Sequence, residues 1–185
     1  MDVEVTADIK KQISDILVHT SDPNNNTQFY DDCDEDLLVI GNYTGHVKCV
    51  EAFLKLELNR NVAILDLACG TGLLGIEVGS HGYDNVDGLD ASLGMLGQAR
   101  KAGVYRDYIV ALVNELGSIP INDETYDVVM CSNGFAPGQI YPSAIPEILR
   151  VMRPGGYLMW TMREGYQAKS QRFALLDAEI NVCIV

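Results

Sequence analysis

The sequence predicts an α/β domain built around a mainly parallel β-sheet, and three observations lead to this fold class. After residue 60, short apolar runs alternate with stretches of helical periodicity, as in repeated βα units. The runs at 62–65 and 128–130 are continuously apolar, which is typical of parallel strands buried on both faces. The chain has 185 residues, 48% of them hydrophobic, which suffices for the core of one globular unit.

The first 60 residues are predicted to form an N-terminal helical cap. Apolar residues at helical spacing predict one helix over 6–18 and another over 46–58. The Asp-Pro and Asn-rich sequence at 21–28 predicts a loop between them. The remaining residues, 61–185, are expected to form the sheet and its helices.

Five strands and four helices are expected within residues 61–185. The strands are predicted at 62–67, 86–89, 108–113, 126–131 and 157–162. The helices are predicted at 72–81, 92–102, 144–152 and 167–181. The Met-Arg-Pro-Gly-Gly segment at 152–156 is interpreted as a structural turn that ends a helix before the fifth strand.

Composition narrows the classes of partner. The 26 acidic and 13 basic residues give a net charge of -13, and no cluster of Lys or Arg offsets it, so nucleic acid is not expected as a partner. No window holds the ~20 apolar residues of a membrane span. The first residues also lack the apolar stretch of a signal peptide. We therefore expect no membrane association and a cytoplasmic or nuclear location.

No metal site is expected either. The five cysteines are odd in number and form no CxxC pair, which predicts neither a disulfide framework nor a zinc site. The acidic run at 31–36 lacks the spacing of a calcium-binding loop and is interpreted as a solvated face.

A glycine-rich segment, DLACGTGLLG at 66–75, follows the first predicted strand. Glycines let the backbone turn sharply and approach a ligand closely at the start of the next helix. The part from Gly70 to Gly75 satisfies GxGxxG, and Asp90 lies at the end of the next strand, as in dinucleotide-binding proteins. Two cofactor classes therefore compete, a nicotinamide dinucleotide and S-adenosylmethionine.

Asp66 helps to distinguish the two classes. A carboxylate four positions before Gly70 repels a pyrophosphate and suits a cation. S-Adenosylmethionine carries a sulfonium and an ammonium group, so Asp66 can order the loop and meet the methionine portion, directly or through water. Asp90 would accept hydrogen bonds from ribose hydroxyls in either class. Both aspartates also have a plainer interpretation as helix caps.

Several motifs in order resemble class I S-adenosylmethionine-dependent methyltransferases over about residues 61–165. They are DLACGTG at 66–72, GLDAS at 88–92 with Met95-Leu96, and LRVMRPGG at 149–156. Further residues at 95–105, 138–140 and 144–147 are similar to one subgroup of that family. The resemblance implies a Rossmann-like sheet with strand order 3-2-1-4-5.

The resemblance also implies the cofactor-binding residues, which we group by the part of the cofactor that each would meet. Asp66, Ala68, Gly70 and Gly72 would surround the methionine portion, and Asp90 would hold the ribose. Ala91 and Met95 or Leu96 would pack on the adenine, Val113, Asn114 or Glu115 would read its edge, and Ser132, Asn133 and Gly134 would close the site at the fourth strand. For Met95 and Leu96, a core position is the alternative.

Methyl transfer is an in-line displacement and needs a base only if the acceptor must lose a proton. The catalytic residue is therefore unknown, with His46 and Tyr43 as weak candidates. The resemblance places Tyr30 and Tyr43 as lid residues over the cofactor. The segment CSNGF at 131–135 differs from the Asp/Asn-Pro-Pro-aromatic box of adenine and glutamine methylation. With Phe135, Ile140 and Tyr141 nearby, we expect a small, partly apolar acceptor.

The C-terminal end departs most from the family. The family sheet has seven strands and ends in an antiparallel hairpin, whereas this sequence has material for five. We expect that the hairpin is missing, that 157–162 forms an unpaired edge open to self-association, and that the chain is a shortened product. Two alternatives to an active methyltransferase therefore stay open. One is a cofactor-binding protein that is catalytically incomplete or regulatory, and the other, from the GxGxxG pattern, is a nicotinamide-dependent oxidoreductase.

Overall fold

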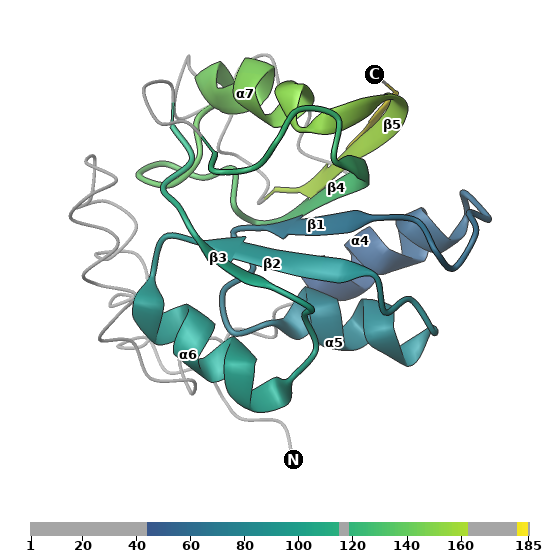
Figure 1. Ribbon diagram of the computed structural model, residues 1–185, viewed down its shortest axis with the longest axis horizontal. Coiled ribbons are helices and arrows are strands. Elements are labelled where there is room, and N and C mark those ends of the chain that lie inside the picture. Colours follow the sequence, from purple (N-terminus) through teal and green to yellow (C-terminus); the bar gives the residue numbers. More distant parts are fainter. Residues whose placement is uncertain (1–43, 115–118, 163–180, 185) are drawn as a thin grey trace, which may run out of the picture.

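The computed structural model describes residues 44–114 and 119–162, and the backbone of 181–184. These residues form one mixed sheet with helices on both faces (Figure 1). The predicted helix over 6–18, most of the predicted helix over 167–181, and the candidates Tyr30, Tyr43 and Glu115 lie outside the described residues. Among the described residues, no helix has the length and apolar character to cross a membrane.

The sheet has six strands in the order β3-β2-β1-β4-β5-β6. The strands are β1 (Ile64–Leu67), β2 (Val86–Asp90), β3 (Tyr108–Val110), β4 (Tyr126–Ser132), β5 (Met152–Thr161) and β6 (Asn181–Ile184). The first five are parallel, and β6 is antiparallel to β5. The predicted order 3-2-1-4-5 is therefore confirmed, and it brings the carboxyl ends of β1, β2 and β4 to one edge.

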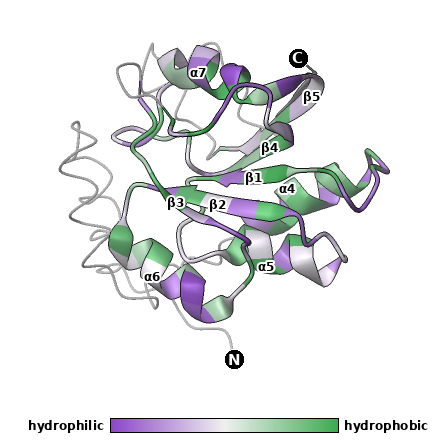
Figure 2. Ribbon diagram, in the orientation of Figure 1, coloured by the Kyte–Doolittle hydropathy of each residue, from purple (hydrophilic) through white to green (hydrophobic). Residues whose placement is uncertain are grey.

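Helices cover both faces of this sheet. They are α4 (Gly45–Leu54), α5 (Leu73–Ser80), α6 (Leu93–Ala102) and α7 (Ile145–Arg150), and a 3-10 turn, η1 (Pro142–Ala144), precedes α7. Figure 1 shows α5 and α6 below the sheet and α7 above it, and α4 packs on the same face as α5. In Figure 2, β1 and β2 are green interrupted by purple, and α4 and α6 carry both colours, as expected of helices with one face on a sheet.

Successive residues of the central strands enter two separate cores. Ile64 on β1 and Met130 on β4 pack with α4, α5 and α6. Their neighbours Leu65 and Cys131 pack on the opposite side with α7 and the segment before it. Side chains alternate between the two faces of a strand, so these continuously apolar runs are buried on both.

Element boundaries depart from the prediction near the end of the sheet. β5 begins at Met152 rather than at residue 157, so the segment predicted as a turn belongs to the strand. The pairing of β4 with β5 shifts register between Tyr126 and Val128, which accommodates the extra residues as a bulge. β3 is shorter than predicted and ends at Val110.

The predicted unpaired edge on the fifth strand is wrong. β6 pairs antiparallel with β5, with Asn181 opposite Trp160 and Ile184 opposite Tyr157. The sheet therefore extends one strand beyond the five expected, and the self-association inferred from an open β5 edge loses its basis there. The sequence analysis predicted a helix up to residue 181 and missed this short strand, because the pairing of β6 depends on residues of β5 that are distant in sequence.

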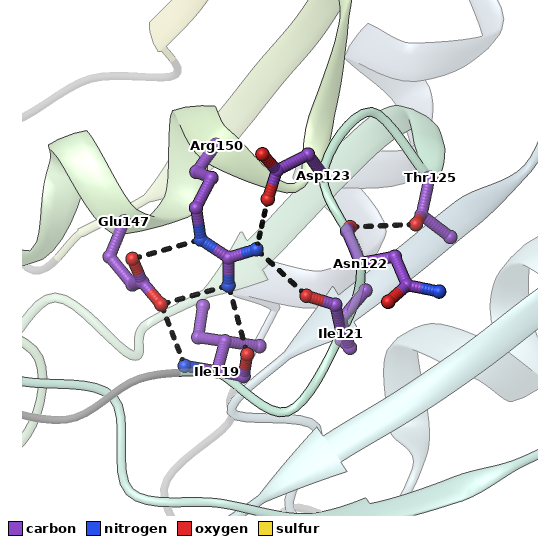
Figure 3. A network of polar contacts seen from close by, with 7 residues as sticks. All are labelled: Ile119, Ile121, Asn122, Asp123, Thr125, Glu147 and Arg150. Atoms are coloured by element: carbon purple, nitrogen blue, oxygen red, sulfur yellow. Dashed lines mark hydrogen bonds and ion pairs between the residues drawn. The ribbon is translucent and has the colours of Figure 1, made fainter.

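Arg150, at the end of α7, joins that helix to the segment before β4 (Figure 3). Its guanidinium donates to the carbonyl oxygens of Ile119 and Ile121 at 2.9 and 2.8 Å. It also pairs with Glu147 at 2.9 Å and with Asp123 at 2.6 Å. Its hydrogen bond to Glu147, and to a smaller extent that to Asp123, raises the pKa of Arg150 above its ordinary value. One side chain thus fixes the segment that continues from the predicted adenine-reading residues.

We expect Arg150→Met to lower the free energy of unfolding by about 2 kcal/mol, because it removes several charged hydrogen bonds from a side chain that is only 29% exposed. Urea unfolding followed by circular dichroism measures the change. Arg153→Met is the matched control, since Arg153 is 47% exposed and pairs with Asp127, and should cost less than about 1 kcal/mol. Equal losses in the two variants would contradict a special role for Arg150.

Candidate functional site

The candidate site begins with the loop between β1 and α5. Three of its residues lie in the left-handed region, with φ of 58° at Ala68, 55° at Gly70 and 94° at Gly72. Glycine adopts this conformation at little cost, and Gly72 is the residue immediately before α5. The loop therefore turns the chain sharply at the carboxyl end of β1 and presents backbone at the start of a helix, as predicted.

Asp90 ties this loop to the end of β2. Its Oδ2 accepts a hydrogen bond from the backbone N–H of Gly70 at 2.8 Å, and its Oδ1 accepts one from that of Ser92 at 2.9 Å. The N-cap of α6 is Ser92, whose Oγ accepts from the N–H of Met95 at 3.0 Å. Asp90 is thus not the cap residue. A carboxylate oxygen can accept more than one hydrogen bond, so this group is of a type that can also accept from a ligand hydroxyl.

Asp66 lies in the middle of β1 and is 1% exposed. Its Oδ2 accepts a hydrogen bond from the hydroxyl of Tyr105 at 2.5 Å, while its Oδ1 has no hydrogen-bond partner among the described residues. Burial raises the pKa of Asp66 to about 7. The hydrogen bond from Tyr105 opposes this shift, the charge of Asp90 adds to it, and the backbone N–H of Gly75 also opposes it. A carboxyl group that changes charge near neutrality therefore lies beneath the loop.

Tyr105 is a site residue to which the sequence reasoning gave no role. Its ring lies between Gly75 on α5 and Gly88 on β2, where an added Cβ would come within 2.4 and 2.6 Å of ring atoms. The third glycine of GxGxxG thus makes room for a tyrosine that donates to Asp66. Two glycines on neighbouring elements were the available signal, but their shared neighbour follows only from the fold.

The residues predicted to meet adenine fall into different environments. Leu96 is buried in the core beneath α6, which supports the core alternative for it. Met95 is 3% exposed and belongs to neither main core cluster. Ala91 is partly exposed at the end of β2. Val113 packs in the opposite core, and its neighbour Asn114 is partly exposed.

The loop after β4 lies against the loop after β1. Ser132 Oγ and Thr161 Oγ1 are 3.2 Å apart, and the N–H of Asn133 donates to the carbonyl oxygen of Thr161 at 2.9 Å. An added Cβ on Gly134 would be 2.8 Å from the Cβ of Ala68. The predicted residues of the first and fourth strands therefore come together at one edge of the sheet.

The residues expected to line an acceptor pocket are mainly core residues. Phe135 is 0% exposed and Ile140 is 5% exposed, and both belong to the core on the α7 side. Tyr141 packs against the same core, and its hydroxyl oxygen accepts from the N–H of Gly138 at 3.0 Å. Their apolar character therefore reflects packing, and that expectation needs correction for Phe135 and Ile140.

His46, a weak catalytic candidate, lies in the first turn of α4 and is partly buried. Burial lowers its pKa, and the charge of Glu77 on α5 opposes the shift. Among the described residues, no group of His, Cys, Asp and Glu is arranged to hold a metal ion.

Comparison with known proteins adds independent information. The sequence matches the methyltransferase domain family over residues 64–156. It is 38% identical over 117 residues to methyltransferase-like protein 27 of Homo sapiens, a match that covers 62% of this chain and 47% of that protein. It is 36% identical over 100 residues to demethylmenaquinone methyltransferase of Symbiobacterium thermophilum, covering 50% of this chain and 39% of the relative. The chain spans less than half the length of these two relatives.

Solved structures match the fold. A protein assigned as an S-adenosylmethionine-dependent methyltransferase from Methanococcus maripaludis has a TM-score of 0.57 and 18% identity, covering 84% of this chain and 69% of that one. A further such methyltransferase, from Aquifex aeolicus, has a TM-score of 0.51 and 21% identity, covering 77% and 73%. At these identities the structures support the fold alone. The subgroup that the sequence resembled is represented by methyltransferase-like protein 27, and that resemblance is confirmed.

Proposed function

Because the chain belongs to the methyltransferase domain family, we propose that it binds S-adenosylmethionine and transfers the methyl group to a small-molecule acceptor. The observation that carries this proposal is the pair of carboxylates at adjacent strands. Asp66 and Asp90 flank a sharply turned loop that includes Gly70 and leads into a helix. Residues 61–185 would hold the cofactor, and the preceding cap would cover the acceptor.

The described residues fit this cofactor. The Asp90 carboxylate, at the end of β2, is of the acceptor type that holds ribose hydroxyls in nucleoside-binding α/β folds. The Oδ1 atom of Asp66, buried without a partner among the described residues, is suited to a cationic group nearby. Ala91, Met95 and Asn114 remain as candidates on the adenine side. When bound, S-adenosylmethionine would supply a methyl group on a positively charged sulfur.

The chain would contribute mainly by positioning. The acceptor atom attacks the methyl carbon opposite sulfur, the carbon–sulfur bond breaks with its electrons on sulfur, and any proton on the acceptor is lost to a base or to water. The contact between Gly134 and Ala68 brings the two loops together at the expected edge of the transfer site. Trp160 near the end of β5 has a buried indole N–H with no partner among the described residues, and it could donate to an acceptor.

A small acceptor is supported by the relatives. Demethylmenaquinone methyltransferases of several bacteria are among them, and their name implies a quinone-related substrate. A cofactor-binding protein without turnover remains the second candidate, because the contacts described above bear on the cofactor and not on the acceptor. A nicotinamide-dependent enzyme is disfavoured, since a pyrophosphate at the glycine loop would oppose ionisation of the Asp66 carboxyl group beneath it, whereas a cation would favour it.

Titration calorimetry of the purified chain tests the cofactor class. We expect binding of S-adenosylmethionine and S-adenosylhomocysteine and none of NAD at equal concentration. Asp90→Ala should weaken binding at least about tenfold, because it removes two charged hydrogen bonds. Asp84→Ala is the matched control, since Asp84 is exposed and lies before the opposite end of β2. Binding of NAD alone would overturn the proposal.

Formation of S-adenosylhomocysteine in a screen of quinols, phenols and amines separates an enzyme from a binding protein. Turnover with a small acceptor is the expected result. Turnover confined to a polymeric nucleic acid would contradict the small-molecule acceptor.

A further inference from the structure

We propose that Tyr105 is a positioning residue for Asp66, and that binding of the cofactor's cationic end expels a proton from the Asp66 carboxyl group. This inference deepens the proposed function and rests on it, because it assigns a specific means of recognising the methionine portion. Tyr105 acts through Asp66, and neither a catalytic step nor direct contact of Tyr105 with the cofactor is required.

The two oxygens of the Asp66 carboxyl group have different surroundings: Oδ2 accepts a hydrogen bond from Tyr105, and Oδ1 is buried without a hydrogen-bond partner among the described residues. The Tyr105 hydroxyl donates to Oδ2 at 2.5 Å, and the ring has no lateral freedom between Gly75 and Gly88. Oδ1 is buried and has no partner among the described residues. An ionised carboxylate in that state is costly, since a buried charge needs a compensating charge or hydrogen bonds.

The groups around Asp66 provide no positive charge. Cys49 on α4, Cys131 on β4 and Cys69 in the glycine loop all interact with it, and burial raises the pKa of each thiol, so they remain neutral. Asp90 on β2 adds a negative charge, and Tyr105, before β3, has a pKa raised above its ordinary value by burial and by Asp66. Among the described residues Asp66 forms no ion pair, so a proton is its compensating charge without cofactor.

A bound cation can replace that proton. With a pKa of about 7, both forms of the Asp66 carboxyl group are populated at pH 7 and the protonated form predominates at pH 5.5. A sulfonium or ammonium group nearby favours the ionised form and lowers this pKa, so binding releases a proton. The affinity for cofactor should then fall roughly fifteenfold from pH 7.0 to pH 5.5.

Calorimetry in buffers with different ionisation enthalpies measures the released proton directly. For S-adenosylmethionine, we expect the wild type to release a fraction of a proton per molecule bound at pH 7.0 and most of one proton at pH 5.5. Tyr105→Phe should release more at pH 7.0 than the wild type and shift the pH midpoint of affinity up by about one unit, because it removes a hydrogen bond that favours the charged carboxylate. The ligand's own amino group contributes equally in every variant.

Tyr126→Phe is the matched control. Tyr126 is also a buried tyrosine that donates to a buried aspartate, Asp87, at 2.9 Å, but it lies at the other end of β4. The variant should lose comparable stability and release as much proton as the wild type at every pH. Methylthioadenosine, which lacks both the sulfonium and the amino acid portion, is the ligand control, and its binding should release no proton in any variant.

The outcomes separate this inference from the proposed function. Absence of binding by S-adenosylmethionine and S-adenosylhomocysteine to the wild type would overturn both. Binding with no proton release at pH 5.5, or with equal release by the wild type and Tyr105→Phe at pH 7.0, would overturn this inference and leave the proposed function standing. If Tyr105→Phe does not fold, Asp66→Asn replaces it, and its binding must release no proton and lose the pH dependence.

Discussion

Gly75→Ala is expected to destabilise the protein by about 3 kcal/mol, although alanine is intrinsically the better helix residue. The added methyl group would lie 2.4 Å from one ring carbon of Tyr105 and 2.7 Å from its hydroxyl oxygen. The ring cannot retreat, because Gly88 contacts its other side and Asp66 holds the hydroxyl. The steric cost therefore exceeds the gain of about 0.5 to 1 kcal/mol that alanine normally gives within a helix. Urea unfolding of both proteins measures the difference.

Gly79→Ala is the matched control on the same helix. No atom lies within 4 Å of a methyl group added at Gly79, so this change should be neutral or stabilise the protein by about 0.5 kcal/mol. A second control introduces Gly75→Ala into a Tyr105→Leu background. Leucine lacks the outer ring atoms and the hydroxyl that the methyl group would meet, so there the alanine should no longer be costly. An equal cost in both backgrounds would contradict the clash with Tyr105.

The same glycine illustrates how far the sequence alone leads. Local signals place it correctly, because an apolar strand followed by a glycine-rich turn and a helix is a short-range pattern. The pattern also predicts the positions of Asp66 and Asp90, since the carboxyl ends of adjacent parallel strands meet at one edge. What the pattern does not contain is the reason for Gly75, which is a tyrosine brought beneath it by the return of the chain through α6.

Two errors have a related physical origin. Phe135 and Ile140 follow a site strand and are apolar, so the sequence cannot distinguish a pocket lining from a core. The strand Asn181–Ile184 is short, and its pairing with β5 is a long-range contact that local propensity does not report. In both cases the sequence identifies apolar residues correctly, and the partner against which they pack is decided by the assembled fold.

Asp66→Asn is expected to remove a pH-dependent loss of the free energy of unfolding that affects the wild-type protein without cofactor. The carboxyl pKa is about 7 in the folded protein, against an ordinary value of 3.8. A carboxyl pKa raised by folding means that stability is greatest below the unfolded pKa and is lost as pH rises towards 7. From pH 5 to pH 8, the wild type should therefore lose about 2 to 3 kcal/mol relative to Asp66→Asn.

Urea unfolding of both proteins at pH 5, 6, 7 and 8 measures this difference. The change of the difference with pH is the informative quantity, because the amide also alters the contact with Tyr105 and so shifts its absolute value. Glu51→Gln, on the exposed side of α4, is the control for the loss of one acidic group. A difference that does not change with pH would mean that Asp66 keeps one protonation state across this range. Because no cofactor is present, that result would contradict the buried carboxyl group's titration near neutrality whether or not the chain proves to be a methyltransferase.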